Sequence, residues 1–238
     1  MMEQWRAEVV LLIPAKYDSE REAVARAWVA RGGKVLSIAK FWKRPELGEV
    51  EVSLYGFDTF CQVLAQQLGV VLESPREELL AQLAKRWVKR RMVRQRLGEL
   101  AERAFPCFVK PLVPKSFPAA VYASRKALAE ATQGLGMEVG LMVSEVVVVE
   151  REVRCFVLAG KVLDLAFYEG EGEVALAREW VQTFLAVAPA ELPRAYVLDL
   201  GFSAERGWFI LEFNAAWGAG LNGCQAERVI AAIRAASH

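Results

Sequence analysis

The stretch that most constrains the fold is residues 197–224, VLDLGFSAERGWFILEFNAAWGAGLNGC. Two apolar runs flank residues 204–207, AERG, which suit a four-residue hairpin loop that ends in glycine. If the turn is centred on this loop, Asp199 faces Glu212 across the hairpin, and Asn214 lies on the same face. A slip of one residue would place the two acids on opposite faces. The sequence therefore predicts a hairpin that carries two carboxylates on one face.

These two acids need a neutralising partner. Like charges directly opposite each other on a sheet cost roughly 0.2–1 kcal/mol. A cation is the natural remedy, because two carboxylates and an amide oxygen are hard oxygen ligands of the kind that Mg²⁺ takes together with phosphate oxygens. We therefore predict that Asp199, Glu212 and Asn214 hold Mg²⁺.

The residue types in the chain exclude several kinds of catalytic site. The only histidine is His238, so Ser-His-Asp and Cys-His nucleophile systems and histidine-based zinc hydrolases are ruled out. The four cysteines (Cys61, Cys107, Cys155 and Cys224) form no C-x-x-C pair, and we expect them to be buried free thiols. Any chemistry must use lysine, arginine, carboxylates and a metal.

The composition limits the partners and the cellular compartment that we expect for the chain. The net charge of +1 gives no overall attraction to nucleic acid or to a membrane surface. The apolar run near the N-terminus is about six residues long, too short for a signal sequence or a membrane span. We therefore expect a soluble cytoplasmic protein with no membrane partner. With 54% hydrophobic residues, the chain of 238 residues has ample apolar content for a core in one large or two small domains.

The first 80 residues predict a β-α-β opening and a parallel sheet. Ser19 and Glu22 have the spacing of a capping box at a helix start, and Ser74-Pro75 has the pattern of another helix start. The predicted elements are a strand over 8–13, a helix over 19–31, a strand over 34–41, a helix over 58–68 capped by Asp58, a short strand over 70–72 and a helix from Ser74. We assign residues 1–80 to an N-terminal α/β domain.

The rest of the chain, residues 81–238, predicts longer strands with fewer helices, an α+β pattern. The predicted elements are a strand pair over 105–111 and 119–122, a helix over 124–132, apolar strands over 138–149, 152–158 and 161–168, a helix over 173–187, the acidic hairpin, and a closing amphipathic helix over 225–236. The expected class is therefore α/β, with α+β character in a second domain.

Three features outside the hairpin have both a functional and a structural interpretation. Lys110 lies within the apolar strand CFVKP and either meets an anion or is an edge-strand lysine that reaches solvent. Glu152 and Arg154 share a strand face, as a functional pair or an exposed ion pair. Glu145 precedes four valines, which form either a hinge for a flat ring or part of the core.

Two further segments are open to two interpretations. The first is a basic cluster on a predicted helix and its continuation, either a solvated face or a phosphate or nucleic-acid contact. Only Trp87 lies among these bases, so stacking of single strands is poorly supported. The second is residues 217–223, WGAGLNG, either a flexible loop over a substrate or a turn. The cluster comprises Lys85, Arg86, Lys89, Arg90, Arg91, Arg94 and Arg96.

The order of these features resembles the ATP-grasp superfamily. In that superfamily a lysine in a V-K-P-like strand, a glutamate-led hinge, an acid after the hinge and a late D…E-x-N set follow one another, as FVKP, SEVVVV, EREVRCFV and the acidic hairpin do here. The chain is most similar to a clade named for two arginines and a lysine, in LYGFDTFCQVLAQQLG, FVKP…KSF, VRCFVLAGKV and LEFNAAWGAGLNGC. These segments span residues from about 54 to 224, and the ordered set is fairly specific.

The resemblance implies an ATP-grasp-like fold with an N-terminal pre-ATP-grasp part, and ATP and Mg²⁺ as cofactors. It implies catalytic Lys110, Arg154 and Arg91, with Arg90 as a close competitor of Arg91. The nucleotide contacts that it implies are Lys110 and Lys115 on the phosphates, Glu145 and Val147 at the adenine hinge and Glu152 on the ribose. The metal ligands that it implies are Asp199, Glu212 and Asn214.

The implied activity is ligation of a carboxylate to an amine through an acyl phosphate, with a small-molecule or peptide acid. Many members of the superfamily are dimers, so a homodimer is compatible with the resemblance. The chain departs from the pattern in two places. The loop after Lys110 lacks a glycine-rich lid, for which Lys115 and Ser116 would stand in, and the first metal acid is Asp199 rather than a glutamate.

Three other functions stay open at this point. A nucleotide-binding module without turnover predicts ATP binding alone. An interaction domain that uses the basic cluster predicts salt-dependent binding of RNA or an acidic partner, which the balanced charge argues against. A kinase on the same scaffold differs only in the fate of the phosphoryl group.

Overall fold

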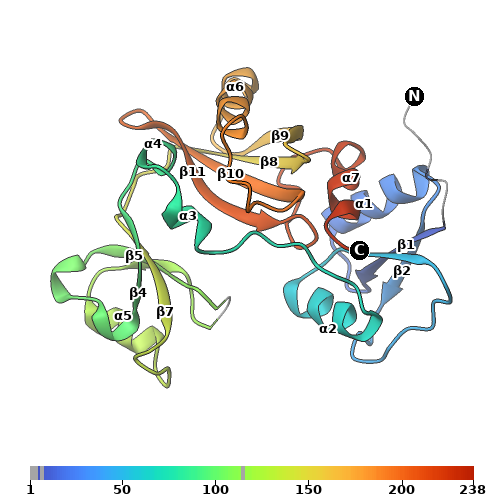
Figure 1. Ribbon diagram of the computed structural model, residues 1–238, viewed down its shortest axis with the longest axis horizontal. Helices are drawn as coiled ribbons and strands as arrows, with labels where there is room; N and C mark the ends of the chain where they lie inside the picture. Colours follow the sequence, from blue (N-terminus) through green and yellow to red (C-terminus); the bar gives the residue numbers. More distant parts are fainter. Residues whose placement is uncertain (1–4, 6–7, 114–115) are drawn as a thin grey trace. The chain divides into compact units, whose positions relative to one another are not determined.

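The computed structural model describes Trp5, residues 8–113 and residues 116–238, and divides into two compact units (Figure 1). Unit 1 comprises residues 1–75, 151–201 and 211–238, and unit 2 comprises residues 76–150 and 202–210. The mixed α/β class is confirmed. The division into domains 1–80 and 81–238 stays a prediction, because compact units need not coincide with functional domains.

The N-terminal sheet of unit 1 has the order β2-β1-β3, and both outer strands run parallel to β1. All six side chains of β1 are buried, as the apolar run VVLLIP requires. This arrangement confirms the predicted β-α-β opening. The strands are β1 (Val9–Pro14), β2 (Lys34–Ile38) and β3 (Glu51–Leu54), and the helices are α1 (Ser19–Ala30) and α2 (Asp58–Leu68).

Some element boundaries in unit 1 differ from the prediction. Asp18, not Ser19, caps α1, because its carboxylate accepts from the backbone N–H of Arg21 at 2.9 Å. Residue 57 occupies the N-cap of α2, so Asp58 is the first helical residue and not the cap. The strand predicted over 34–41 ends at Ile38, and that over 70–72 is a single bridge from Leu72 to Ser237.

The helix predicted from Ser74 is wrong. Instead α3 (Leu79–Gln82) and α4 (Lys85–Val88) are two short helices that begin later. The indole N–H of Trp217 reaches both the carbonyl of Glu73, at 2.9 Å, and the hydroxyl of Ser74, at 3.2 Å. These tertiary hydrogen bonds hold the segment outside a helix, although its local pattern favours one.

The second sheet of unit 1 has the order β11-β10-β8-β9. Residues 159–160 form the turn that joins β8 to β9, which pair antiparallel. Phe156 and Val197 belong to the same buried cluster as the β1 side chains, so the core of unit 1 is continuous. The elements are β8 (Arg151–Leu158), β9 (Lys161–Glu169), α6 (Val174–Leu185), β10 (Ala195–Ser203), β11 (Gly207–Ala215) and α7 (Ala226–Ala235).

Unit 2 contains a sheet of order β4-β7-β5-β6, built on a small core that includes Val109, Leu128 and Leu141. The predicted strand pair is confirmed as β5 and β6, and Ser124 caps the following helix by accepting from the N–H of Ala127 at 3.2 Å. The elements are β4 (Met92–Arg96), 3₁₀ turns Leu97–Glu99 and Glu102–Ala104, β5 (Cys107–Pro111), β6 (Ala120–Tyr122), α5 (Arg125–Ala131) and β7 (Gly140–Ser144).

The cysteines are buried free thiols, as predicted. Burial raises the pKa of the Cys224 thiol to about 12, so this group is protonated and unreactive at neutral pH. Among the described residues, no helix combines the length and the apolar character that crossing a membrane requires.

Candidate functional site

The acidic hairpin brings its three polar side chains together. The amide nitrogen of Asn214 donates to Asp199 Oδ2 at 2.9 Å and to Glu212 Oε1 at 3.0 Å. Because one amide group reaches both acids, the three side chains share one face of the β10–β11 hairpin. The expected placement of the two acids on a common face is therefore confirmed.

Arg154 on the neighbouring strand β8 neutralises the buried acid of this set. Its Nε donates to Asp199 Oδ1 at 2.9 Å and its Nη2 to Oδ2 at 2.6 Å, a bidentate pair. Asp199 is only 1% exposed. Burial raises the pKa of Asp199, and the hydrogen bond from Arg154 opposes that rise. The sequence predicted that a metal cation compensates the charge of Asp199. In the structure Arg154 compensates it, from a strand that lies 45 positions earlier in the chain.

The donor types at the hairpin fit a hard divalent cation. Two carboxylates and one amide are oxygen donors, and a half-turn of the Asn214 amide would present its oxygen in place of its nitrogen. Among the described residues, no three Asp, Glu, Cys or His side chains form a metal-sized group, so the third donor has to be the amide. Asp199 also has both oxygens engaged by Arg154. The metal assignment stays a prediction.

Glu152 lies on β8 two residues before Arg154 and accepts a hydrogen bond from the hydroxyl of Tyr168 on β9. The guanidinium of Arg154 lies 5.7 Å from the centre of the Tyr168 ring. Burial raises the pKa of Tyr168, so its hydroxyl stays protonated and can donate. Tyr168 was not predicted as a site residue, because nothing in the sequence marks a tyrosine at a strand end as a partner of β8.

Lys110 occupies an inner strand of unit 2, so the edge-strand interpretation is wrong. Its ammonium lies 2.9 Å from the carboxylate of Glu77, and about a quarter of its side chain is exposed. The alternative that a lysine in this apolar strand must meet an anion is thus correct, and Glu77 is an anion within unit 2. Lys115 lies outside the described residues.

The two candidate arginines before β4 differ in burial. Arg90 is 7% exposed, donates to the Ile210 carbonyl at 2.6 Å and lies 5.7 Å from the Phe209 ring centre. The side chain of Arg91 is exposed, and its backbone N–H donates to the Glu145 carboxylate at 3.1 Å. Arg90 therefore supports the packing of unit 2, which leaves Arg91 as the better candidate for a ligand contact.

The valine run after Glu145 is not core. Val146 and Val148 are exposed, and residues 145–149 have no regular secondary structure. Of the two interpretations of this run, the core interpretation is therefore wrong. Glu145 itself is fixed by Arg206, whose Nη1 lies 2.5 Å from its carboxylate.

Arg206 and the Arg91 N–H lower the pKa of Glu145, which predicts a pH-dependent contribution to stability. A lowered folded-state pKa adds stability above the unfolded value of 4.5, and this stability is lost as the pH falls through the folded-state pKa. The carboxyl side chain is 40% exposed, so we expect Glu145→Gln to lower the free energy of unfolding by at most about 1 kcal/mol at pH 7 and by less at pH 3.5. Urea denaturation at both pH values measures this.

Glu205→Gln is the matched control for Glu145→Gln, because the exposed carboxylate of Glu205 lies 3.9 Å from Arg206. It should change the free energy of unfolding little at either pH. A Glu145→Gln loss that is equal at pH 7 and pH 3.5 would contradict the assignment of the effect to ionised Glu145.

The basic cluster begins on a helix, as predicted, and its continuation is a strand. It runs through α4, a left-handed residue at Lys89 and strand β4. Several members are engaged: Lys89 donates to the Arg206 carbonyl at 2.5 Å, and Arg96 lies 2.8 Å from Glu138. The cluster is therefore in part structural.

The glycine-rich segment 217–223 is fixed by hydrogen bonds, which contradicts the flexible-loop interpretation. Both oxygens of Glu20 accept from backbone N–H groups, of Leu221 and Asn222, at 2.8 Å each. Tyr55 donates to the Ala219 carbonyl at 2.9 Å. Glu20 and Tyr55 were not predicted to hold this segment, because their partners are more than 160 positions away in the chain.

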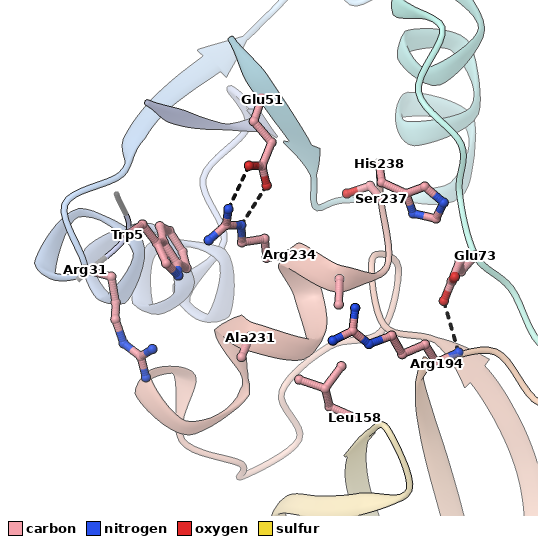
Figure 2. A pocket seen from close by; sticks show the side chains of 11 residues that line it. Trp5, Arg31, Glu51, Glu73, Leu158, Arg194, Ala231, Arg234, Ser237 and His238 are labelled. Carbon is pink, nitrogen blue, oxygen red and sulfur yellow. Dashed lines mark hydrogen bonds and ion pairs between the residues drawn. The ribbon is translucent and has the colours of Figure 1, made fainter. Parts of the chain in front are cut away.

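A cavity of about 800 Å³ lies at another part of unit 1 (Figure 2). It contains the bidentate ion pair of Arg234 with Glu51, at 2.7 Å for each bond, and the hydrogen bond from the Arg194 N–H to Glu73. The predicted site residues are not among the side chains that line it. Its lining is Trp5, Arg31, Glu51, Glu73, Leu158, Arg194, Ala231, Arg234, Ala235, Ser237 and His238.

An ATP-grasp domain model, that of family 2 in the clade named for two arginines and a lysine, matches residues 87–232, more than half of the chain. The chain belongs to this ATP-grasp family. The recognition from sequence motifs is therefore confirmed. The matched range includes Lys110, Arg154 and the acidic hairpin, and it excludes the β1–β3 sheet. Among curated protein sequences, none matches the chain.

Solved structures confirm the ATP-grasp fold. N5-carboxyaminoimidazole synthetase from Staphylococcus aureus, in complex with ADP, has a TM-score of 0.60 at 13% identity, over 98% of this chain and 78% of that chain. D-alanine–D-alanine ligase from Bacillus anthracis, in complex with ATP, has a TM-score of 0.59 at 13% identity, over 97% and 96%. Macrocyclase MdnC from Microcystis aeruginosa, bound with precursor peptide MdnA, has a TM-score of 0.54 at 13% identity, over 95% and 98%. At these identities, the similarity establishes the fold alone.

Proposed function

We propose that this ATP-grasp protein is an ATP- and Mg²⁺-dependent ligase that joins a carboxylate to an amine. The carboxylate attacks the γ-phosphate to give an acyl phosphate and ADP, and the amine then displaces phosphate. The observation that carries the proposal is the convergence of Arg154, Asp199, Glu212 and Asn214 in unit 1. This chemistry needs no histidine, because it depends on positioning and charge neutralisation.

Arg154 is the catalytic residue whose geometry is best defined. Three of its five guanidinium N–H groups are used, two on Asp199 and one on the Gly220 carbonyl at 2.9 Å. The remaining two can hold an anion, either the transferred phosphoryl group or the substrate carboxylate. The bidentate contact with Asp199 fixes the plane of the guanidinium, so Asp199 positions Arg154 in addition to its proposed role at the metal.

Glu212 and Asn214, with Asp199, would hold Mg²⁺. When bound there, the ion offsets the negative charge of the ATP phosphates. Glu212 is more accessible than Asp199, so the charge at this face depends mainly on Glu212.

The remaining assignments come from the family resemblance. Lys110 and Lys115 contact phosphates, Glu145 and Val147 belong to the segment that holds adenine, and Glu152 contacts the ribose. The exposure of the valine run supports the adenine assignment, because an apolar strip accessible to solvent can receive a flat ring. Arg91 is the second arginine, assigned to the phosphoryl group or the substrate carboxylate.

Two of the structurally similar proteins bear on the substrate class. One is by name a D-alanine–D-alanine ligase and another was solved with a precursor peptide. They support an amino acid or a peptide as a substrate here.

Calorimetric titration of ATP, with and without Mg²⁺, tests the proposal together with Lys110. We expect Mg²⁺-dependent binding to the wild-type protein, and a Kd about tenfold or more higher for Lys110→Ala, because one charged hydrogen bond to phosphate is lost. Glu77→Gln is the matched variant: it removes the carboxylate 2.9 Å from Lys110, so it should bind ATP at least as tightly as the wild type.

Unchanged ATP affinity in Lys110→Ala would mean that Lys110 has only a structural role, in its ion pair with Glu77. Folded wild-type protein that does not bind ATP would contradict the ligase proposal. Release of ADP with a phosphorylated product and no amide would identify a kinase.

A further inference from the structure

The cavity of about 800 Å³ in Figure 2 lies at the amino edge of the β1–β3 sheet. Of its lining residues, Glu51 begins β3, Trp5 comes before β1 and Arg31 follows the last turn of α1. Ligands of open parallel sheets bind at the opposite, carboxyl edge, so this cavity is separate from that binding region. Small-molecule sites have volumes of roughly 300–1,000 Å³, and the cavity falls within that range. It therefore has room for a ligand that the proposed reaction does not use.

The charged side chains of this cavity favour an anion. Three guanidiniums line it, those of Arg31, Arg194 and Arg234, together with two carboxylates. Both carboxylates are already engaged. Arg234 holds Glu51 through two bonds of 2.7 Å, and Glu73 accepts from two consecutive backbone N–H groups, at 3.1 and 3.4 Å. The excess of positive charge is therefore left for a ligand.

Arg194 is the residue best placed to bind this anion. Its guanidinium has no hydrogen-bond or ion-pair partner among the described residues, and Figure 2 shows it extending from the start of β10 toward α7. Its backbone is fixed, because its N–H donates to Glu73 at 3.1 Å and its carbonyl accepts from the N–H of Ala159 at 2.7 Å. Five guanidinium N–H groups are thus available on a fixed backbone, in a planar fork that matches a carboxylate or a phosphate group.

Two other residues of the cavity have donors to spare. Arg234 uses two of its five N–H groups on Glu51, so three remain. The Ser237 hydroxyl accepts a backbone N–H at 3.1 Å and keeps its hydrogen for another acceptor. The wall that carries Ser237 is fixed, because Val71 and His238 exchange two backbone hydrogen bonds, of 2.5 and 3.0 Å. These donors belong to well-held backbone, which favours a defined binding geometry.

The cavity also has apolar walls. Trp5, Leu158 and two alanines of α7 line it. The ring of Trp5 is held from two sides: its centre lies 4.3 Å from that of Trp28 and 4.9 Å from the guanidinium of Arg234. Trp5 and Leu158 are only half-buried, so part of each side chain is open to a ligand. An anion that carries an apolar group can therefore bury that group here.

The cavity is well separated from the proposed catalytic arginine. Arg194 directly precedes β10, and Asp199, the partner of Arg154, is five residues further along that strand. At about 3.3 Å per residue, this separation is about 17 Å. A ligand in the cavity and a nucleotide at the acidic hairpin can therefore be bound at the same time.

We propose that this cavity is a second ligand site, for a small organic anion that joins a phosphate or a carboxylate group to an apolar body. Arg194 binds the anionic group, and the spare N–H groups of Arg234 and the hydroxyl of Ser237 offer further donors. The apolar body packs on Trp5 and Leu158. The inference does not depend on the ligase proposal, because it uses none of the residues assigned to that reaction.

Calorimetric titration of probes that share one ring system into the full chain tests the inference. The probes are naphthyl phosphate, naphthoate, the neutral naphthylmethanol and the cationic naphthylmethylamine, with inorganic phosphate as the anion that lacks a ring. We expect at least one of the two naphthyl anions to have a Kd about tenfold or more below that of the alcohol, because a charged hydrogen bond is gained. The tighter of the two identifies the anionic group that the site prefers. Inorganic phosphate should bind more weakly than naphthyl phosphate, because it makes no apolar contact.

Four variants locate the binding. Arg194→Gln should abolish the preference for the anion over the alcohol, whereas Arg26→Gln should retain it, because Arg26 is an exposed arginine of α1 that does not line the cavity. Ala231→Trp should block the cavity, and Ala231→Ser should still bind, because only the large side chain fills the space beside α7. Circular dichroism checks that each variant is folded.

Glu51→Gln gives a signature that a purely structural role of the cavity would not produce. The substitution removes the carboxylate that holds Arg234 and frees further N–H groups for the ligand. We therefore expect Glu51→Gln to bind the preferred anion more tightly than the wild type.

Four results would overturn the inference: no binding of either naphthyl anion, tighter binding of the amine than of both anions, equal effects of Arg194→Gln and Arg26→Gln, or wild-type binding by Ala231→Trp. A repeat of the titration with saturating ATP and Mg²⁺ should leave the affinity for the anion measurable. Complete displacement of the probe by the nucleotide would place the anion in the nucleotide site and would also overturn the inference.

Discussion

Glu212→Ala is expected to lower Mg²⁺-dependent ATP turnover by at least about 100-fold. The substitution removes the more accessible carboxylate of the acidic face, together with one of the two acceptors of the Asn214 amide. Glu212 is only half-buried, so the fold should persist. Calorimetry with ATP and Mg²⁺, and ADP release where a substrate pair is known, measure the effect, and circular dichroism checks the fold.

Glu205→Ala is the matched control for Glu212→Ala. It is the same substitution in the turn of the same hairpin, at a side chain that is 82% exposed. It should retain wild-type ATP binding and turnover. Wild-type Mg²⁺ dependence in Glu212→Ala would remove the metal role from the acidic hairpin.

Arg154→Ala is expected to give the largest loss of stability, about 3–5 kcal/mol in the free energy of unfolding. The buried Asp199 would keep only its hydrogen bond from Asn214, at 2.9 Å, and would lose both bonds from the guanidinium. Arg154→Lys should have an intermediate effect, because an ammonium keeps the charge without the bidentate geometry. Urea denaturation at pH 7 measures the free energies.

The double variant Arg154→Ala with Asp199→Asn identifies the cause of that loss. A neutral amide at position 199 leaves no uncompensated charge, so the double variant should be more stable than Arg154→Ala alone. If the two substitutions instead destabilise additively, the loss comes from packing rather than from the charge pair. Both variants should lack ligase activity, since the proposed catalytic arginine is absent.

The predictable parts of the fold are those whose local pattern agrees with their tertiary surroundings. The β1 strand is a continuous apolar run, and the acidic hairpin is two apolar runs joined by a turn that ends in glycine, and both were predicted. Strand β3 was missed, because Glu51–Leu54 is only four residues long and half polar. The helix expected from Ser74 has good local start residues, but hydrogen bonds from Trp217, more than 140 positions away, outweigh them.

The residue types of the candidate site were predictable, but their pairing was not. Spacing alone placed Asp199, Glu212 and Asn214 on one face, because all three belong to a single hairpin. The Arg154–Asp199 pair depends on β8 lying next to β10, which no local pattern encodes. The contacts of Glu77 with Lys110 and of Glu20 with the glycine-rich segment likewise depend on the tertiary fold, and no local pattern encodes them.

The three-segment construction of unit 1 has a consequence for synthesis of the chain. The N–H of Leu54 bonds the hydroxyl of Ser237, 183 positions later, and α7 packs beside α1 and β3. A ribosome that adds 5–20 residues per second needs roughly ten to forty seconds to synthesise the residues between Leu54 and Ser237. The residues of β4 to β7 emerge earlier and can pair first. The nascent N-terminal sheet therefore waits with one apolar face uncovered, which makes it the segment that a holdase chaperone would meet.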